Sequence, residues 1–173
     1  MIWFAADLHL GHWNIVKYCK RPFTSVAEMD KALIENWNSV VGKDDFVYHL
    51  GDFALGSRDK IKFYEDQLNG KIIHIKGNHD NHNFIGSNIQ SAVIEMFGKR
   101  IRLVHNAYFN YTDDVDIVLC GHVHDKWKWF KKGKIDFINV GVDAWFYHPI
   151  GMKQIVKFLK FGDRYDEKKI KRR

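Results

Sequence analysis

The sequence predicts an α/β fold with a parallel sheet at its centre and a second, more antiparallel sheet after it. Short apolar runs alternate with helical patterns in the first half, whereas the later apolar runs follow one another without clear helices between them. Strands that alternate with helices form parallel sheets through right-handed crossovers. Strands are predicted at residues 2–6, 45–50, 71–76, 92–97, 100–104, 116–120, 134–140 and 152–159, and helices at 25–41 and 57–69.

The helix predicted at residues 25–41 has a recognisable beginning and end. Ser25 and Glu28 have the spacing of a capping box, and Gly42 stands where a glycine commonly ends a helix. Because apolar residues recur inside it at helical intervals, one face is expected to pack against a sheet. The apolar residues of the two helices are Met29, Leu33, Trp37 and Val40 in the first, and Ile61, Tyr64 and Leu68 in the second.

The bulk properties are those of one basic domain. The chain has 173 residues, of which 46% are hydrophobic and 28% charged, as in ordinary globular proteins. We predict a domain over residues 1–162 and a basic tail over residues 163–173, which holds six basic and three acidic residues. The net charge of +6 suits an anionic substrate. The tail is expected either to contact nucleic acid without sequence preference or to be a solvated end of the chain.

Several classes of protein are disfavoured by the sequence. No apolar run approaches the roughly 20 residues that a membrane span needs, and residues 1–7 lack the basic and apolar regions of a signal peptide. We therefore expect a cytoplasmic protein without a membrane partner. Cys19 and Cys120 are expected to be free thiols, and neither belongs to a C-x-x-C pair, which argues against a cysteine-based zinc knuckle.

Five apolar runs each end in residues that bind metals or act in catalysis. Ligands of α/β proteins gather at the carboxyl ends of strands, so five such ends in order indicate one shared site. A single His or Asp in such a place would mean little. The five segments are Asp7-Leu8-His9, Gly51-Asp52, Gly77-Asn78-His79-Asp80, His105 and Gly121-His122-Val123-His124.

The residue types in these segments suit a pair of divalent cations. Two neighbouring cations repel each other, so they need an anionic bridge, which Asp52 can supply. Imidazole and carboxylate together favour Mn, Fe, Zn, Co or Ni over Mg or Ca. On an extended segment Asp7 and His9 would point to the same side of the chain, because strand side chains alternate. A glycine before Asp52, Asn78 and His122 permits a sharp turn and close backbone approach.

The ordered motifs also resemble those of calcineurin-like metallophosphoesterases. D-x-H, G-D, G-N-H-D, a lone His and G-H-x-H follow one another from Asp7 to His124, over about two-thirds of the chain. The segments at residues 7–15 and 18–23 are further similar to a small, stand-alone prokaryotic and phage branch of predicted phosphoesterases. The resemblance implies a four-layer α/β/β/α sandwich of two mixed sheets flanked by helices.

The same resemblance implies a role for each motif residue. Asp7, His9 and His124 would bind one metal, and Asn78, His105 and His122 would bind a second. Asp52 would bridge the two metals. His79 would assist the leaving group, with Asp80 orienting it. Mn²⁺ is the expected ion, and Fe, Ni, Zn and Co also suit these ligands.

These inferences together predict a metal-dependent phosphoric ester hydrolase, with a phosphodiesterase acting on a nucleotide or nucleic acid as the favoured form. A phosphomonoesterase is the first alternative. A non-catalytic adaptor or nucleic-acid-binding protein is the second, and the complete ligand set argues against it. Another class of zinc hydrolase is disfavoured because H-E-x-x-H is absent.

Other residues have two interpretations each. His12, Asn14 and Arg21 could line the substrate pocket, with Arg21 gripping phosphate through two parallel hydrogen bonds, or they could belong to a structural loop. The aromatic and basic segment at residues 127–132 could stack a base, but we favour a hairpin whose aromatic residues pack on a sheet. His49 and His74 are expected to be structural.

Overall fold

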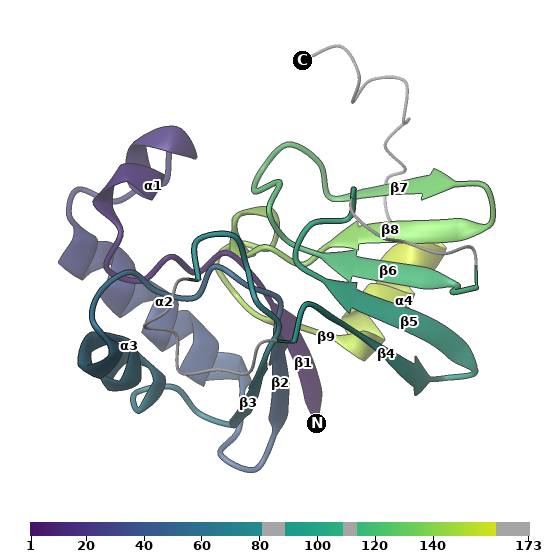
Figure 1. Cartoon of the computed structure of the whole chain (residues 1–173), viewed down its shortest axis with the longest axis horizontal. Coiled ribbons are helices and arrows are strands. Elements are labelled where there is room, and N and C mark those ends of the chain that lie inside the picture. Colours follow the sequence, from purple (N-terminus) through teal and green to yellow (C-terminus); the bar gives the residue numbers. More distant parts are fainter. Residues whose placement is uncertain (81–88, 109–113, 162–173) are drawn as a thin grey trace.

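Two mixed β-sheets form the centre of the structure (Figure 1). The computed structural model describes residues 1–80, 89–108 and 114–161, so the predicted basic tail lies outside the described residues. The elements are β1 (Ile2–Ala5), α1 (Trp13–Tyr18), α2 (Val26–Val40), β2 (Phe46–His49), α3 (Arg58–Glu65), β3 (Lys71–His74), β4 (Ser91–Met96), β5 (Lys99–Val104), β6 (Ile117–Cys120), β7 (Trp129–Lys132), β8 (Ile135–Asn139), a 3-10 turn (Val142–Ala144), β9 (Ile150–Gly151) and α4 (Met152–Phe161).

The first sheet has the strand order β3-β2-β1-β9. β1, β2 and β3 are parallel to one another, as predicted from their alternation with helices, and β9 pairs with β1 in the antiparallel direction. The carboxyl ends of the three parallel strands therefore lie at one edge of this sheet. The loops that carry the first three predicted metal-binding motifs begin there.

The second sheet has the order β4-β5-β6-β8-β7 and, as predicted, it is more antiparallel than the first, since two of its four strand pairings are antiparallel against one of three. β5, β6 and β8 are parallel at its centre, and only the two edge strands run antiparallel to their neighbours. The parallel pairings within it were missed because, among the described residues, no helix stands between β5 and β6 or between β6 and the β7–β8 hairpin. A parallel crossover without a helix leaves no helical periodicity in the sequence.

Helices α1, α2 and α3 pack on the outer face of the first sheet. Alternate residues of β1, Trp3 and Ala5, face this helical layer, where Trp37 of α2 is fully buried. The predicted start of α2 is present, because the Ser25 hydroxyl accepts a hydrogen bond from the Glu28 amide at 3.1 Å. Among the described residues, no helix is long and apolar enough to cross a membrane.

A second core lies between the two sheets. Phe4 and Leu50 from the first sheet meet Leu103 and Leu119 from the second. Helix α4 contributes Ile155 to the same core, so it lies on the inner face of the second sheet beside the first sheet. The α/β class with two mixed sheets and helices is therefore confirmed, and α4 adds to the layer between the sheets.

The aromatic residues of this segment are buried on both faces of the second sheet. Trp127 and Phe130 pack on the outer face, where Phe130 stacks on Phe137 with 4.7 Å between ring centroids, and Trp129 packs into the core between the sheets. Trp127, Trp129 and Phe130 are 3%, 7% and 6% exposed. These rings cannot stack a nucleic-acid base while they are buried. The hairpin interpretation of residues 127–132 is correct, and β7 and β8 are its two strands.

The strand predicted at residues 152–159 is wrong, because this segment forms α4. Its β-branched residues suggested a strand, but its apolar residues have helical spacing. Met152 and Ile155 are the buried positions, and Val156 and Leu159 pack partly buried against the same core. Positions i, i+3, i+4 and i+7 form one face of a helix, and this periodicity is the stronger signal.

Because α4 packs into the core between the sheets, truncating Ile155 should lower the stability of the protein strongly. Ile155→Ala should lower the free energy of unfolding by about 2–4 kcal/mol, because the side chain is fully buried and leaves a cavity. Lys157→Ala on the exposed face of the same helix should change it by less than about 0.5 kcal/mol. Urea unfolding of both variants measures the difference, and equal effects would contradict this packing.

Candidate metal centre

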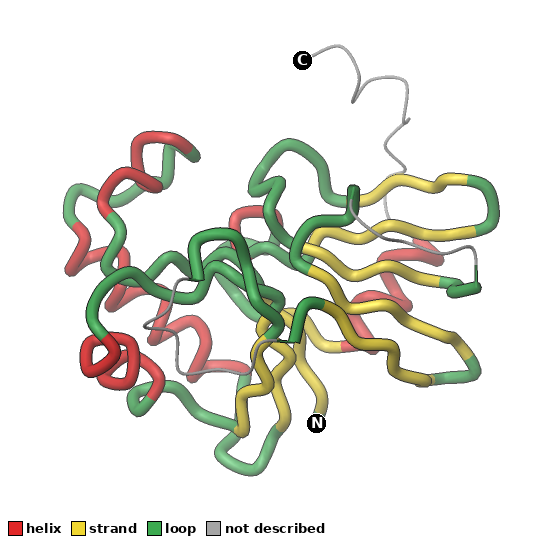
Figure 2. Tube along the Cα trace, in the orientation of Figure 1, coloured by secondary structure: helices red, strands yellow, loops and turns green. Residues whose placement is uncertain are grey.

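The loops after the parallel strands of both sheets meet in the middle of the molecule (Figure 2). β1, β2 and β3 lead into the segments of Asp7, Asp52 and Asn78, and β5 and β6 lead into those of His105 and His122. Segments up to 115 residues apart are joined here, since the His122 amide donates to the Asp7 carboxylate at 2.9 Å. All five predicted strand ends thus contribute to one place.

Among the described residues, three groups of three side chains are close enough to hold a metal ion, and two of them consist of predicted ligands. Within each group the possible donor atoms all lie within 4.8 Å of one another. The first group is Asp7, His9 and His124, the set implied for the first metal. The second is Asp7, Asp52 and His105, so Asp7 belongs to both groups.

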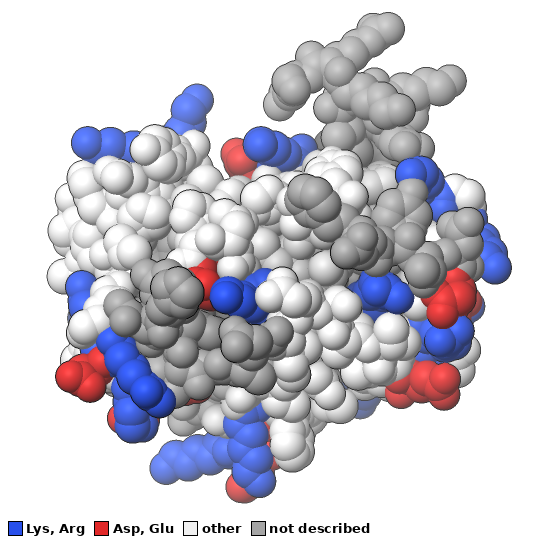
Figure 3. Space-filling model, viewed as in Figure 1, with Lys and Arg blue, Asp and Glu red and all other residues white. Residues whose placement is uncertain are grey.

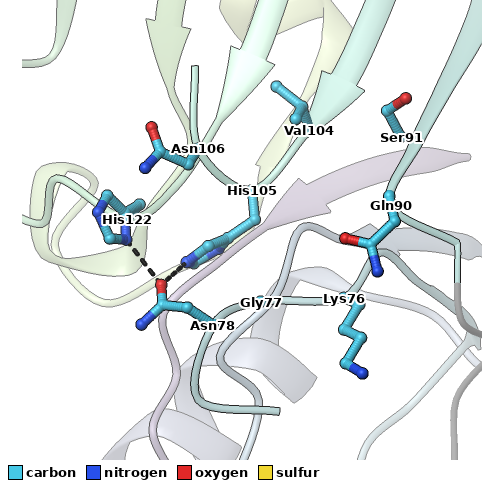
Figure 4. A pocket seen from close by; sticks show the side chains of 9 residues that line it. All are labelled: Lys76, Gly77, Asn78, Gln90, Ser91, Val104, His105, Asn106 and His122. Carbon is cyan, nitrogen blue, oxygen red and sulfur yellow. Dashed lines mark hydrogen bonds between the residues drawn. The ribbon is translucent and has the colours of Figure 1, made fainter. Parts of the chain in front are cut away.

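The three residues implied for the second metal also converge. The side-chain oxygen of Asn78 lies 2.9 Å from His105 Nε2 and 2.8 Å from His122 Nδ1 (Figure 4). Asn78 comes from the first sheet and the two histidines from the second. An amide oxygen and two imidazole nitrogens at these distances are a suitable set of donors for a transition metal.

Asp52 lies between the two sets of ligands. Its Oδ2 atom is 3.5 Å from His9 Nε2 and 3.3 Å from His105 Nε2, which belong to different sets. Its Oδ1 atom accepts a hydrogen bond from the His79 amide at 2.8 Å. One oxygen therefore faces both candidate metal positions while the other is held by the backbone.

Five of the predicted ligands have a left-handed backbone, with φ angles of 50–71° at Asp7, His9, Asp52, His122 and His124. Residues other than glycine seldom adopt this conformation. The extended geometry assumed for D-x-H is therefore wrong, because β1 ends at Ala5. The side chains converge through turns, and the strained backbone concentrates where the ligands lie.

Gly51 permits the close approach of the first and second sheets. Its φ angle is 95°, and a Cβ atom there would lie 2.6 Å from His105 Nδ1 and from the Cα atom of Gly77. No side chain larger than hydrogen fits at that distance. The glycine before Asp52 thus serves the role that was predicted for it.

Burial sets the charge of the first ligand group. Burial raises the pKa of Asp7 to about 6, although the positive charges of His105 and His124 oppose this rise. Burial also lowers the pKa of His9 to about 3, so His9 is neutral. A neutral imidazole is the form that binds a metal, and a nearby cation would stabilise the buried carboxylate.

Asp52 and His105 stabilise each other's charged forms. Burial alone would raise the pKa of Asp52, but its hydrogen bond and charge interaction with His105 hold that pKa below its ordinary value. Burial likewise opposes the charged form of His105, and the contact with Asp52 outweighs it and raises the pKa of His105. Asp52 is thus an anion positioned to balance added positive charge.

One buried atom in the described part of the site also lacks a partner that a bound cation would supply. His9 Nε2 is buried and has no hydrogen-bond partner among the described residues, although it faces Asp52. A buried polar atom without a partner costs about 1–3 kcal/mol, so such atoms are uncommon in native proteins. A metal ion between His9 and Asp52 would supply the missing partner.

Asp80 has a different role from the one predicted. It is buried and accepts hydrogen bonds from the amides of Asp52 at 2.9 Å, Phe53 at 3.0 Å and Gly77 at 2.8 Å. These contacts occupy both carboxylate oxygens. Asp80 therefore joins the Asp52 loop to the Asn78 turn, and it holds the backbone of the site rather than the ring of His79.

His79 and His12 lie at the accessible side of the centre. His79 is exposed, and its ring centroid is 5.4 Å from that of His9 and 6.2 Å from that of His12. His12 precedes α1 and is half-buried, with Nδ1 3.5 Å from His9 Nδ1. Asn14 is exposed on α1, and no contact between described residues joins it to the site.

Arg21 is not placed to contact a substrate, which corrects its interpretation as a phosphate ligand. The residue is 3% exposed. Its guanidinium donates to both oxygens of Asp143 at 2.8 and 2.9 Å and to the carbonyls of Leu8 at 2.9 Å and Asp7 at 2.6 Å. The bidentate grip predicted for Arg21 exists, but it holds a protein carboxylate behind the D-x-H loop.

Asp143 was missed by the sequence analysis. Its Oδ2 atom is 2.9 Å from His124 Nδ1, and together with Cys19 and His124 it forms a third group of donors within 4.8 Å. Burial lowers the pKa of His124, but hydrogen bonds with Asp143 and Cys19 outweigh this and raise it to about 10. The signal was present, because Gly141 and Asp143 follow the end of β8 as Gly51 and Asp52 follow β2.

Comparison with known families agrees with this geometry. Residues 1–149 match the calcineurin-like phosphoesterase superfamily domain. The chain belongs to the calcineurin-like phosphoesterase superfamily. The family supports the class of metal-dependent phosphoric ester hydrolases, and the Asp and His clusters provide candidate metal sites.

Several similar proteins span nearly the same length. The chain is 40% identical over 168 residues to the uncharacterized protein MJ1445 of Methanocaldococcus jannaschii, covering 93% of this chain and 92% of that one. It is 28% identical over 181 residues to the gene 66 protein of Mycobacterium phage L5, covering 83% and 86%. The solved protein of unknown function AQ665 from Aquifex aeolicus has a TM-score of 0.72 at 27% identity, covering 91% and 98%.

The contact between Asp143 and His124 predicts that Asp143 tunes metal affinity. Asp143→Asn should weaken Mn²⁺ binding about 10- to 100-fold, because residues that orient metal-binding histidines have effects of this size. With Nδ1 directed at the Asp143 carboxylate at 2.9 Å, Nε2 is the ring nitrogen that His124 would offer to a metal. Calorimetric titration of the metal-free protein with Mn²⁺ measures the change.

Asp136→Asn is the matched control for this variant. Asp136 is a half-buried carboxylate on β8 that contacts Trp129 and Lys131. Its substitution should leave Mn²⁺ affinity unchanged. Thermal unfolding of both variants shows whether they are folded, and an unchanged affinity in folded Asp143→Asn would rule out the positioning role.

Proposed function

We propose that this protein is a phosphodiesterase that uses two divalent metal ions, with Mn²⁺ as the preferred ion, and acts on a nucleotide or nucleic-acid substrate. The observation that carries this proposal is the convergence of three carboxylate or amide groups and four histidines from both sheets. His9 Nε2 adds to it as a buried atom that lacks a partner among the described residues. Asp7, His9 and His124 would hold one ion, Asn78, His105 and His122 the other, and Asp52 would bridge them.

The position of Arg21 favours a diester over a monoester. A phosphomonoester carries up to two negative charges, and a site that prefers it gains from a guanidinium directed at the phosphate. Arg21 is buried and directs its guanidinium to Asp143 and two carbonyl groups. The diester carries a single charge and needs less compensation.

When bound, the two ions would lower the pKa of water at the site and balance the charge on phosphate. The chain itself provides the proton for the leaving group. His79 is exposed beside His9, and its backbone amide is fixed by Asp52 at 2.8 Å. Its imidazole would donate a proton to the departing ester oxygen, and His12, with its ring centroid 6.2 Å from that of His79, would contact the phosphate.

Because Asp52 and His79 have separate proposed roles, their variants should differ in whether they lose metal binding as well as activity. Asp52→Asn should lose both metal and activity, because it removes the charge that faces both ion positions. His79→Ala should keep its metal but lose roughly 10²–10⁴-fold in kcat, the usual contribution of general acid catalysis. Metal analysis and hydrolysis of bis-p-nitrophenyl phosphate after restoring Mn²⁺ to metal-free protein measure both quantities.

His148→Ala is the control for the loss of a histidine, since His148 Nδ1 contacts the carbonyl of Phe146. It should keep metal and activity. Full activity in His79→Ala would remove the role assigned to His79. Faster hydrolysis of p-nitrophenyl phosphate than of the diester would instead make the protein a monoesterase, and a wild-type protein that binds no metal would make it an adaptor.

A further inference from the structure

A cavity of about 620 Å³ lies at the end of the second sheet that is opposite to the metal centre. β5, β6 and β8 begin at this end, and β5 and β6 run from it toward His105 and His122 (Figure 1). One side of α4 forms the other wall. Since β5 has six residues and spans roughly 17 Å, the cavity is separate from the metal centre.

Apolar side chains form the floor of this cavity. Ile117 begins β6, and Met152, Val156 and Leu159 lie on one side of α4. The core between the sheets buries Val156 and Leu159 only in part, so some of their apolar surface faces the cavity. Removing such surface from water is favourable, and the volume is within the range of about 300–1,000 Å³ that is usual for small-molecule sites. The floor therefore suits an aliphatic group.

Phe97 adds an exposed aromatic ring to the wall of the cavity. It lies in the turn between β4 and β5, is 67% exposed and has a φ angle of 52°. Short hairpin turns favour asparagine and glycine at such backbone angles, so a phenylalanine there is unusual. At this position the ring would cover one end of an apolar group that lay on the floor.

Five lysines surround the apolar floor, and two carboxylates lie among them. Lys99 pairs with Asp116 at 3.0 Å and Lys131 pairs with Asp136 at 3.2 Å, so these charges balance. Among the described residues, neither carboxylate is within ion-pair distance of the other three lysines, which are Lys134, Lys153 and Lys160.

The excess of three positive charges favours an anion. All five lysines are exposed, so their ammonium groups stay in water at the rim while the floor remains apolar. Lysine and arginine side chains (blue) stand with fewer carboxylates (red) along the right-hand end of the molecule in Figure 3, where the hairpins of the second sheet lie in Figure 1. A ligand with an apolar body and one anionic end would match both parts of the cavity.

Larger occupants fit this cavity less well. The chain has a net charge of +6, so a second copy would bring like charges together. A nucleic-acid backbone would place phosphates near Asp116 and Asp136 and would leave the apolar floor uncovered. A partner peptide commonly adds to a strand edge or lies along an open groove, whereas two hairpins and α4 bound this cavity.

We propose that this cavity binds an organic anion with an extended aliphatic chain, such as a long-chain carboxylate. The chain would lie on the apolar floor formed by β6 and α4, with the ring of Phe97 at one end. The carboxylate would stay at the rim, where the lysine charges exceed the acidic ones. The site is separate from the proposed phosphodiesterase reaction, and binding to it needs no metal ion.

Three probes separate the contribution of the chain from that of the charge. Decanoate has a long chain and a negative charge, hexanoate has the same charge on a shorter chain, and decyltrimethylammonium has the long chain with a positive charge. Decanoate should bind about tenfold more tightly than either of the others, because both the buried chain and the charge contribute. Calorimetric titration measures the three affinities, and equal binding of decanoate and either other probe would overturn the proposal.

The same titration with and without Mn²⁺ distinguishes this cavity from the metal centre. Decanoate should bind metal-free and Mn²⁺-loaded protein equally, because the cavity lies at the other end of the sheet. Binding that requires Mn²⁺ would place the carboxylate on the metal and would overturn the proposal.

Met152 reports where decanoate binds, because its side chain lines the cavity. In protein labelled with ¹³C-methyl methionine, decanoate should shift the Met152 signal in the NMR spectrum. The Met29 signal should stay in place, since Met29 packs in the core between the helices and the first sheet. Met152→Leu assigns the signal. A Met152 signal that does not move at saturating decanoate would contradict this site.

A variant with three charges removed tests the rim. Replacement of Lys134, Lys153 and Lys160 by glutamine should weaken decanoate binding about tenfold and leave decyltrimethylammonium binding no weaker. The matched control replaces Lys17, Lys31 and Lys43, three exposed lysines on or next to α1 and α2, and it changes the net charge equally. The control should keep its affinity for decanoate. Equal losses in both variants, or no loss in the first, would overturn the role of the rim.

Two further measurements identify another occupant if decanoate does not bind. A dimer in sedimentation analysis that Val156→Asp separates would show that a second copy covers the cavity. Binding of oligothymidylate that the first glutamine variant loses and the control keeps would make this end of the sheet a nucleic-acid surface. Either result would overturn the proposal.

Discussion

The site depends on holding two carboxylates, Asp7 and Asp52, near each other in a buried place. Burial raises the pKa of Asp7, so its charged form is costly without positive partners. Hydrogen bonds from the His122 amide to Asp7 and from the His79 amide to Asp52 fix both groups. The Arg21 guanidinium holds the backbone of the Asp7 loop from behind. The backbone and the buried ion pair of Arg21 thus position the acidic groups before any cation arrives.

Most of the fold could be predicted because its segments have clear periodicity. The parallel order of β1, β2 and β3 followed from alternating strands and helices, and α2 began at the capping box of Ser25. The residues at 152–159 were mistaken for a strand because β-branched composition was given more weight than helical spacing. Parallel pairing of β5, β6 and β8 could not be predicted, since it depends on loops and on contacts distant in sequence.

The residue types of the candidate site could be predicted better than the contacts that hold these residues in place. Strand ends followed by Gly and a polar residue indicated which side chains would meet, and the structure brings those side chains together. Whether a conspicuous charged residue faces solvent or the protein interior could not be predicted. Arg21 and Asp80 lie in segments where either role is possible, and partners such as Asp143, 122 residues from Arg21, decide it.

The two sheets contribute different ligands, and this division has a mechanical consequence. Asp7, His9, Asp52 and Asn78 come from the first sheet, whereas His105, His122 and His124 come from the second. An ion bound by both Asp7 and His124 would link two positions more than 100 residues apart in the sequence. It would close a long loop of the chain, as a long-range disulfide does. Metal at this place would act as a removable cross-link between the sheets, so a chelator would loosen the packing of one sheet on the other as well as empty the site.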